Sequence, residues 1–129
     1  MDRNELFLLH KELCSTGREL MERKNADYGA TTDPFANFRM AALLHMRPEL
    51  GVLLRLQDKM ARLVSFIEKG NLAVKEESWK DAIIDIINYS VILCGLLQEH
   101  TQGKAPLVEV VEKYLSFDTD KIPITEQTR

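Results

Sequence analysis

Residues 76–99 read EESWKDAIIDIINYSVILCGLLQE, and this stretch decides the fold class. At about 100° per residue, its isoleucines and leucines point in nearly every direction around a helix. A helix that is apolar all round is a buried one. A run of isoleucines also suits a β-strand, but the length of the stretch and its lack of internal turn residues favour a helix. We therefore predict a central helix from about Glu76 to Glu99 that other helices cover.

Three further helices are predicted upstream, because apolar residues recur there every three or four positions. They are expected over about residues 3–27, Pro34–Met46 and Pro48–Lys69. Gly17 lies in the middle of the first helix, where glycine costs about 1 kcal/mol relative to alanine, so we expect another element to pack closely against it. Asp33 followed by Pro34 is typical of an N-cap with proline at the first helical position.

The helix predicted over Pro48–Lys69 separates its apolar and polar side chains into two stripes. The apolar stripe, which on an amphipathic helix faces the core, consists of Leu53, Leu56, Met60, Leu63 and Ile67. The opposite stripe consists of Arg55, Asp58, Lys59, Arg62 and Ser65. We expect this helix to stop at Gly70, since glycine suits the left-handed cap.

The chain has the size and composition of one domain, with 129 residues of which 45% are hydrophobic and 29% charged. No stretch has convincing strand character, so the predicted fold class is an all-α bundle of three or four main helices over residues 1–129. From about residue 103 onward we expect a short helix, Pro106–Leu115, and a loosely held tail. We also expect a homo-oligomer, a dimer or tetramer, because few helices are available to cover the central one.

Charge and composition argue against several classes of function. The net charge is −3, which argues against direct nucleic-acid binding through clustered basic residues. No apolar run approaches the ~20 residues of a membrane span, and residues 1–5 lack the pattern of a secretion signal. Cys14 and Cys94 lie within helical patterns and are most simply buried free thiols of a reducing compartment. We therefore expect a cytoplasmic protein.

Four polar residues share one stripe of the predicted central helix: Glu77, Asp81, Asp85 and Asn88. Asp85 stands between two pairs of isoleucines, where a carboxylate is costly unless it is paired or binds a metal. One interpretation is a salt bridge to the preceding helix, which offers Arg55, Lys59 and Arg62. The other is a magnesium site, because Mg²⁺ takes carboxylate oxygens and keeps positions open for water and phosphate.

The two long helices in the second half of the chain carry opposite charge. From Arg39 to Lys69 there are six Lys and Arg against three Asp and Glu, whereas from Glu76 to His100 there is one Lys against five Asp and Glu. Such helices either neutralise each other or frame a polyanion, held through metal on one side and through Arg and Lys on the other. The pattern alone does not choose between these two roles.

A third cluster combines asparagines with aromatic residues in the segments KNADYG, residues 24–29, and DPFANFR, residues 33–39. These residue types are suited to recognising a nucleobase and stacking on it. The alternative is structural: Phe35 and Phe38 would anchor the core, while Asn25, Asp27 and Asn37 would serve as caps or turn residues.

The same segments carry a resemblance. KNADYG, DPFANFR, RLQDKMARL and KEESWKDAIIDIINYSVIL, in this order over about residues 15–98, resemble the "nucleotide modification associated domain" family of bacteria and their phages. The arrangement is also similar to the all-α MazG-type and dimeric dUTPase-type pyrophosphohydrolases. That resemblance implies an oligomeric, Mg²⁺-dependent enzyme of a bacterial or phage-infected cell, which cuts nucleoside triphosphates to monophosphate and pyrophosphate.

We therefore predict Mg²⁺- or Mn²⁺-dependent hydrolysis of a (deoxy)nucleoside triphosphate. The residues expected to hold the metal are Asp58, Glu77, Asp81 and Asp85. The residues expected to bind substrate are Lys24, Asn25, Asp27, Tyr28, Asn37, Phe38, Arg39, Arg55, Lys59, Arg62 and Asn88. In this prediction the metal neutralises phosphate charge and activates a water molecule.

Two other functions stay open. One is a nucleotide-binding protein without catalysis, such as a phage or accessory protein that sequesters or senses its ligand; the other is a helical interaction module whose charges are structural. The discriminating feature is Asp58, the one carboxylate of QDKMAR, where the pyrophosphohydrolases carry three. A single carboxylate favours binding, whereas carboxylates from a second protomer would restore the enzyme.

Overall fold

The computed structural model describes residues 1–27, 33–70 and 78–103, and the regular structure of these residues is entirely helical. The elements in chain order are α1 (Arg3–Asp27), α2 (Ala36–Arg39), the 3₁₀ helix η1 (Met40–Leu44), α3 (Pro48–Lys69) and α4 (Trp79–Thr101). The described part of the chain contains no strand, so the predicted all-α class is confirmed. The short helix predicted over Pro106–Leu115 lies outside the described residues.

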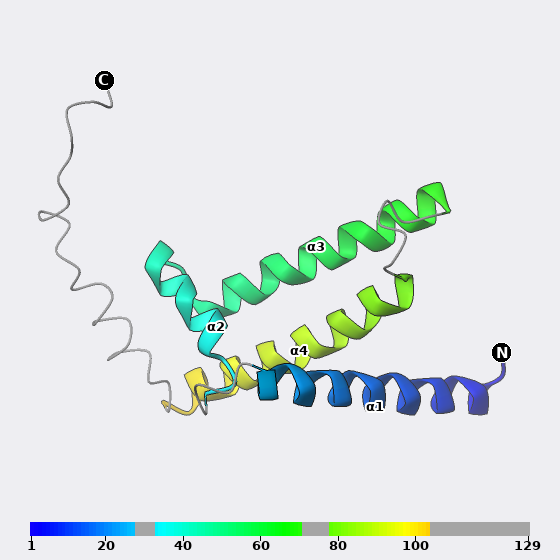
Figure 1. The fold of residues 1–129 in the computed structure, drawn as a ribbon, viewed down its shortest axis with the longest axis horizontal. Coiled ribbons are helices and arrows are strands. Elements are labelled where there is room, and N and C mark those ends of the chain that lie inside the picture. The colour runs from blue at the N-terminus through cyan, green and yellow to red at the C-terminus, as the bar shows by residue number, and fades with distance from the viewer. Residues whose placement is uncertain (28–32, 71–77, 104–129) are drawn as a thin grey trace, which may run out of the picture.

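Helix α4 occupies the middle of the arrangement (Figure 1). It packs against α3 on one side, antiparallel to it, and against α1 on the other. Within the described residues α1 and α3 do not pack against each other, and α2 and η1 lie on the first turns of α3. The described residues therefore form an all-α bundle in which α4 is the central helix.

The bounds of α1 and α3 agree with the sequence prediction. Arg47 is extended, as expected before a proline, and α3 begins at Pro48. Gly70 takes the left-handed conformation at φ +73° and donates its N–H to the Phe66 carbonyl. Helix α4 begins at Trp79 rather than near Glu76, because Ser78 forms a capping box with Asp81.

The prediction of one continuous helix over Pro34–Met46 is wrong. Asp33 is not the N-cap: its Oδ1 accepts the N–H of Phe35, and its carbonyl accepts the N–H of Ala36, so a turn precedes the helix. Only four residues then form α2, after which the chain tightens into η1 and ends at His45 with φ 54°. The Asp33 carboxylate also accepts hydrogen bonds from the Arg39 guanidinium.

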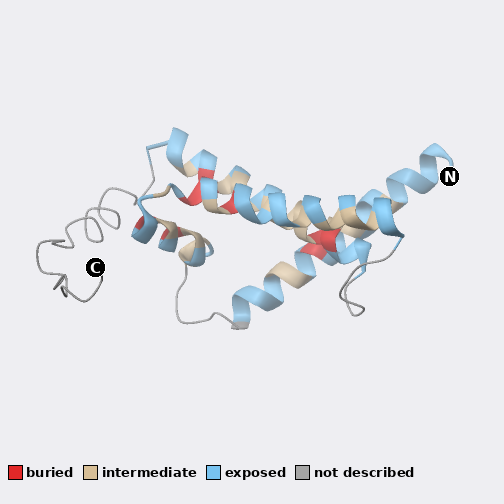
Figure 2. Ribbon diagram, turned by 90° about the horizontal axis from the view of Figure 1, so that it is seen from above, coloured by how far each residue is buried: buried red, intermediate tan, exposed pale blue. Residues whose placement is uncertain are grey.

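The core of the described chain is small (Figure 2). Its buried apolar side chains are Ala42, Val52, Ala82, Ile84 and Leu96. The expectation that α4 is buried on every side is wrong within one chain, because Val91 is 56% exposed and Leu97 44%. Among the described elements, α1 and α3 flank α4 and leave part of its circumference uncovered.

The face of α3 that meets α4 also differs from the prediction. Val52 is fully buried and Lys59 pairs with α4, whereas Met60 and Ile67 of the predicted core stripe are 53% and 80% exposed. The inward face is thus turned by about one residue from the predicted stripe. Its polar member Lys59 pairs with Asp85 of the facing helix.

The close contact expected at Gly17 is confirmed. Asn88 of α4 donates from Nδ2 to the Gly17 carbonyl at 3.0 Å. A methyl group at Gly17 would lie 2.8 Å from Oδ1 of the same side chain. The glycine therefore lets α1 approach α4 closely enough for this bond.

Two expectations about composition do not hold. Cys14 and Cys94 are exposed rather than buried. Helix α4 is, by length and composition alone, apolar enough to cross a membrane, with 23 residues and a mean hydropathy of 1.4. Its central polar residues Asp85 and Asn88 bond to α3 and α1 respectively, as in the interior of a helical bundle.

Candidate functional site

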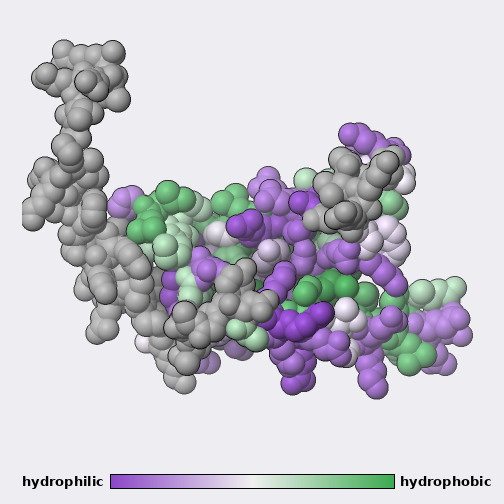
Figure 3. All heavy atoms as spheres, in the orientation of Figure 1, coloured by the Kyte–Doolittle hydropathy of each residue, from purple (hydrophilic) through white to green (hydrophobic). Residues whose placement is uncertain are grey.

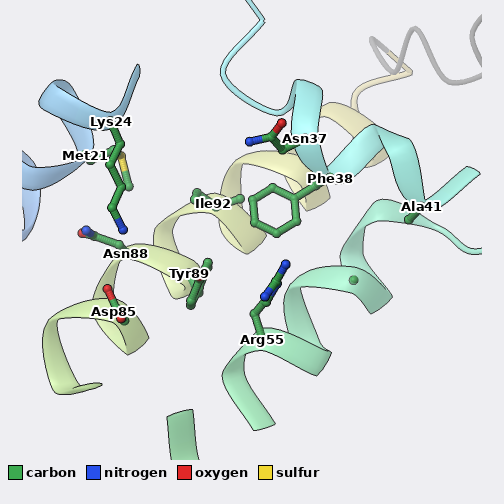
Figure 4. Close-up of a pocket in the computed structure, with 11 residues that line it drawn as sticks. Met21, Lys24, Asn37, Phe38, Ala41, Arg55, Asp85, Asn88, Tyr89 and Ile92 are labelled. Carbon is green, nitrogen blue, oxygen red and sulfur yellow. The ribbon is translucent and has the colours of Figure 1, made fainter. Parts of the chain in front are cut away.

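A cavity of about 380 Å³, here called the main cavity, lies where α1, α2, η1, α3 and α4 meet (Figure 4). It is lined by Met21, Lys24, Asn37, Phe38, Ala41, Gly51, Arg55, Asp85, Asn88, Tyr89 and Ile92. Its volume lies within the range typical of small-molecule sites. The lining unites segments separated by more than sixty positions, which the packing of α1 and α3 against α4 brings together.

Basic side chains enter the main cavity from two helices. In Figure 4, Lys24 extends from α1 toward Asn88, and Arg55 extends from α3 toward the ring of Phe38. Asp85 is the carboxylate of the lining, and it pairs with Lys59 at 2.9 Å. Because that pair cancels its own charge, Lys24 and Arg55 leave the cavity with an excess of positive charge.

Two aromatic rings form one wall. Phe38 and Tyr89 meet edge to face, with their ring centroids 6.1 Å apart and their planes at 88°. Asn37 adds a carboxamide, which both donates and accepts hydrogen bonds. Asn88 has its Nδ2 engaged with Gly17, so its first role is to join α4 to α1. The cavity thus combines an apolar wall with cationic groups.

A second cavity of about 350 Å³, here called the side cavity, shares Lys24 and Asp85 with the first. Its charged lining residues are Arg23, Lys24, Lys59, Asp81 and Asp85. Lys24 and Asp85 therefore stand between two adjoining hollows, with further cations on the far side. An elongated anion lying across them would meet basic groups from α1 and α3.

The predicted metal ligands are only partly brought together. Asp81 and Asp85 line the side cavity, but Asp58 is exposed on α3 and lines neither cavity. Glu77 lies outside the described residues. Over residues 1–27, 33–70 and 78–103, no group of three or more His, Cys, Asp and Glu is placed to hold a metal ion. The four-carboxylate site is therefore not assembled by the described part of one chain.

Asp81 has a structural task at the start of α4. Its carboxylate accepts the backbone N–H and the hydroxyl of Ser78, at 2.9 and 3.0 Å. These hydrogen bonds lower the pKa of Asp81 below its ordinary value. A negative group in the first turn also suits the helix dipole. Capping accounts for this residue without a metal.

Arg39 was predicted to bind substrate, and its position does not support that role. It is buried, bonds to Asp33 and to Glu99 at 2.9 Å, and lies 5.6 Å from the centre of the Phe35 ring. It lines neither cavity. Burial alone would raise the pKa of Asp33, but hydrogen bonds from Arg39 and the Phe35 N–H outweigh it and lower that pKa. Arg39 therefore ties α2 to the end of α4.

The remaining predicted substrate residues divide into three groups. Lys24, Asn37, Phe38, Arg55 and Asn88 line the main cavity, and Lys59 lines the side cavity. Asn25 and Arg62 line neither. Tyr28 and the side chain of Asp27 lie outside the description. Tyr89 was missed, although it lies four positions after Asp85 and so on the same helix face.

Comparisons with protein-family models, with curated proteins and with solved structures find no match for this chain. The fold and the two cavities define it as an all-α protein with a polar, cationic hollow beside an aromatic wall. The likeness to nucleotide-processing families stays a prediction from sequence, so function is argued from the cavities.

Proposed function

We propose that this protein binds a nucleotide across the main and side cavities. The observation that carries the proposal is the meeting of Lys24 and Arg55, from separate helices, with the Phe38–Tyr89 pair in one cavity. A nucleotide needs these two kinds of surface: cations for its phosphates and an apolar, flat face for its base.

The phosphates would lie at the junction of the two cavities. Lys24 borders both hollows, Arg55 reaches the main one, and Arg23 and Lys59 border the side one. Arginine binds phosphate oxygens in pairs through its planar fork, and lysine adds a mobile point charge. The ion pair of Lys59 and Asp85 would hold the junction in shape between α3 and α4.

The base would lie against Phe38 and Tyr89, with Asn37 at its edge. Stacking on an aromatic ring contributes about 1–3 kcal/mol per base and tolerates different bases. The carboxamide of Asn37 would then select among bases by donating and accepting hydrogen bonds. Of the sequence-predicted base pocket, Asn37 and Phe38 support this role through their place in the lining.

Hydrolysis with Mg²⁺ or Mn²⁺ is the second candidate function. Asp81 and Asp85 both line the side cavity, next to Lys24. Proteins bind Mg²⁺ through as few as one or two carboxylates together with substrate phosphates. These two carboxylates would hold the ion, which would neutralise phosphate charge and lower the pKa of a bound water. We rank binding first, because Asp81 and Asp85 already have protein partners.

Equilibrium binding to a panel of NTPs and dNTPs, with and without Mg²⁺, tests the proposal. Arg55→Gln should weaken binding about tenfold or more, as expected for loss of a charged hydrogen bond of ~1.5 kcal/mol or more. Arg18→Gln is the matched control, because Arg18 is exposed and bonds to Glu22 on α1. Failure of every nucleotide to bind would refute the proposal, as would equal losses in both variants.

A separate assay decides between the two candidates. Release of pyrophosphate and monophosphate in the presence of Mg²⁺ or Mn²⁺, abolished in Asp85→Asn, would establish hydrolysis. Binding with no turnover over the whole panel would establish the non-catalytic alternative.

A further inference from the structure

Helix α1 docks on α4 through a face that has Gly17 at its centre. Over residues 3–26, Gly17 is the one buried residue of α1, and its carbonyl accepts a hydrogen bond from Nδ2 of Asn88 at 3.0 Å. Four half-buried residues share this face of the helix: Leu9, Leu13, Leu20 and Met21. The place of α1 in the fold therefore depends on the contact between Gly17 and Asn88.

We propose that this contact positions Lys24 for the phosphates of the bound nucleotide, so that Gly17 and Asn88 are positioning residues of the site. The inference rests on the proposed nucleotide site. Lys24 lies seven positions after Gly17, which is about two turns and 10.5 Å further along the same face of α1. It extends toward Asn88 and borders both cavities (Figure 4). A displacement of α1 on α4 therefore moves Lys24 within the site.

The contact fixes α1 in two directions. A hydrogen bond is short and directional, so the bond to the Gly17 carbonyl opposes sliding of α1 along α4. The missing side chain of Gly17 sets the distance between the helices, because a methyl group there would lie 2.8 Å from Oδ1 of Asn88. Alanine would displace the carboxamide or the helix, although Gly17 itself lines neither cavity. Gly17 therefore offers a way to move Lys24 without altering the lining.

Arg55 reaches the main cavity by a separate route. It belongs to α3, which packs directly against α4 and pairs with it through Lys59 and Asp85 at 2.9 Å. Within the described residues, α1 and α3 do not pack against each other. A change at Gly17 should therefore weaken the phosphate contact of Lys24 and spare that of Arg55.

Calorimetric titration of the full chain tests the inference. The probes are the nucleoside triphosphate that binds the wild type most tightly and its nucleoside, which has no phosphate. Gly17→Ala should weaken triphosphate binding about threefold or more, a part of the roughly tenfold loss expected for Lys24→Gln, and leave nucleoside binding unchanged. Alanine favours a helix more than glycine does, so the substitution does not weaken α1 itself. Ser15→Ala, at an exposed position of α1, is the control and should alter neither affinity.

Double-mutant cycles identify the residue through which Gly17 acts. Gly17→Ala should add little to the loss caused by Lys24→Gln, whereas its effect should add in full to that of Arg55→Gln. Full additivity with Lys24→Gln, or equal losses of triphosphate and nucleoside affinity, would overturn the inference and leave the nucleotide site standing. A wild type that binds no nucleotide would refute the site itself, and the inference with it.

Asn88→Ala is the second variant if Gly17→Ala does not fold. It removes the Nδ2 donor and leaves the sequence of α1 unchanged. Asn88 also lines the main cavity, so part of its effect can come from a direct contact with the ligand. The part that disappears in the Lys24→Gln background reports on positioning. A loss that persists in full in that background would overturn the inference.

Discussion

Nζ of Lys59 lies 2.9 Å from Oδ2 of Asp85, between α3 and α4. The two side chains are 17% and 19% exposed, so both charges are largely withdrawn from water. The pair offsets the cost of placing a carboxylate among isoleucines. Both side chains line the side cavity, where a bound phosphate would compete with Asp85 for the Lys59 ammonium.

Asp85→Asn should destabilise the protein without ligand by about 1–3 kcal/mol, between the values for exposed and fully buried pairs. The reason is that Lys59 keeps its charge and loses its partner. Thermal melting measures the loss. The double change Lys59→Met with Asp85→Leu should recover most of it, because it removes both charges together. An unchanged melting temperature in Asp85→Asn, with Mg²⁺ stabilising only the wild type, would favour a metal site instead.

Ser78→Ala should cost about 1 kcal/mol, because it removes the N-cap that accepts the Asp81 N–H. Urea unfolding gives the change in free energy. Ser90→Ala is the control: its hydroxyl donates to the Ile86 carbonyl in the middle of α4, away from the helix termini. Equal effects of the two substitutions would argue against a capping role for Ser78.

Stability should fall at acid pH in part through Asp33. Its pKa is lowered in the folded protein from the ordinary value of 3.8, so its contribution is fully present above that value. The contribution is lost as the pH falls through the folded pKa, because Arg39 then faces a neutral acid. The Asp33→Asn variant should be less stable than the wild type near neutrality. Its free energy of unfolding should also change less with pH between about pH 5 and pH 2. If the free energies of unfolding of the two proteins changed in parallel with pH, Asp33 would not be the group responsible.

Gly95→Ala should destabilise the fold by about 1–3 kcal/mol, as overpacking does. A methyl group there would lie 2.7 Å from Cζ of Phe35, whose ring is a rigid neighbour. Gly51→Ala is the matched control, because its methyl meets nothing closer than Ala41 at 3.7 Å. That change should stabilise α3 by up to about 1 kcal/mol. Thermal melts of the two variants should therefore move in opposite directions.

Local signals predicted most of the fold. Pro48 and Gly70 bound α3 because proline and glycine act through the backbone, whatever packs around them. The start of α4 is encoded as well, since Ser78 and Asp81 have capping-box spacing, but the prediction of a start near Glu76 overlooked this signal. By contrast, the break between α2 and η1 accompanies contacts of Arg39, including one to Glu99 sixty positions away, and no local pattern reveals such a partner.

The sequence predicted the kinds of residue in the candidate site better than it predicted which individual residues line the cavities. Lys24, Asn37 and Arg55 do line one cavity. Arg39 lines neither cavity and pairs with Asp33 and Glu99. Asp81 lines the side cavity and caps α4, so its predicted metal role stays a prediction. Sequence spacing identifies residues that share a helix face, but it does not tell which of them already have a partner across the fold.

The position of α4 between α1 and α3 has a consequence for the order of folding. Helices α3 and α4 are neighbours in sequence, whereas the bond between Gly17 and Asn88 closes 71 positions. Because loop closure makes distant contacts slower to form, we expect the α3–α4 hairpin to assemble first and α1 to dock last. Lys24 arrives with α1, so the main cavity is complete only after this final step. Ligand binding should therefore slow amide hydrogen exchange in α1 more than in α3.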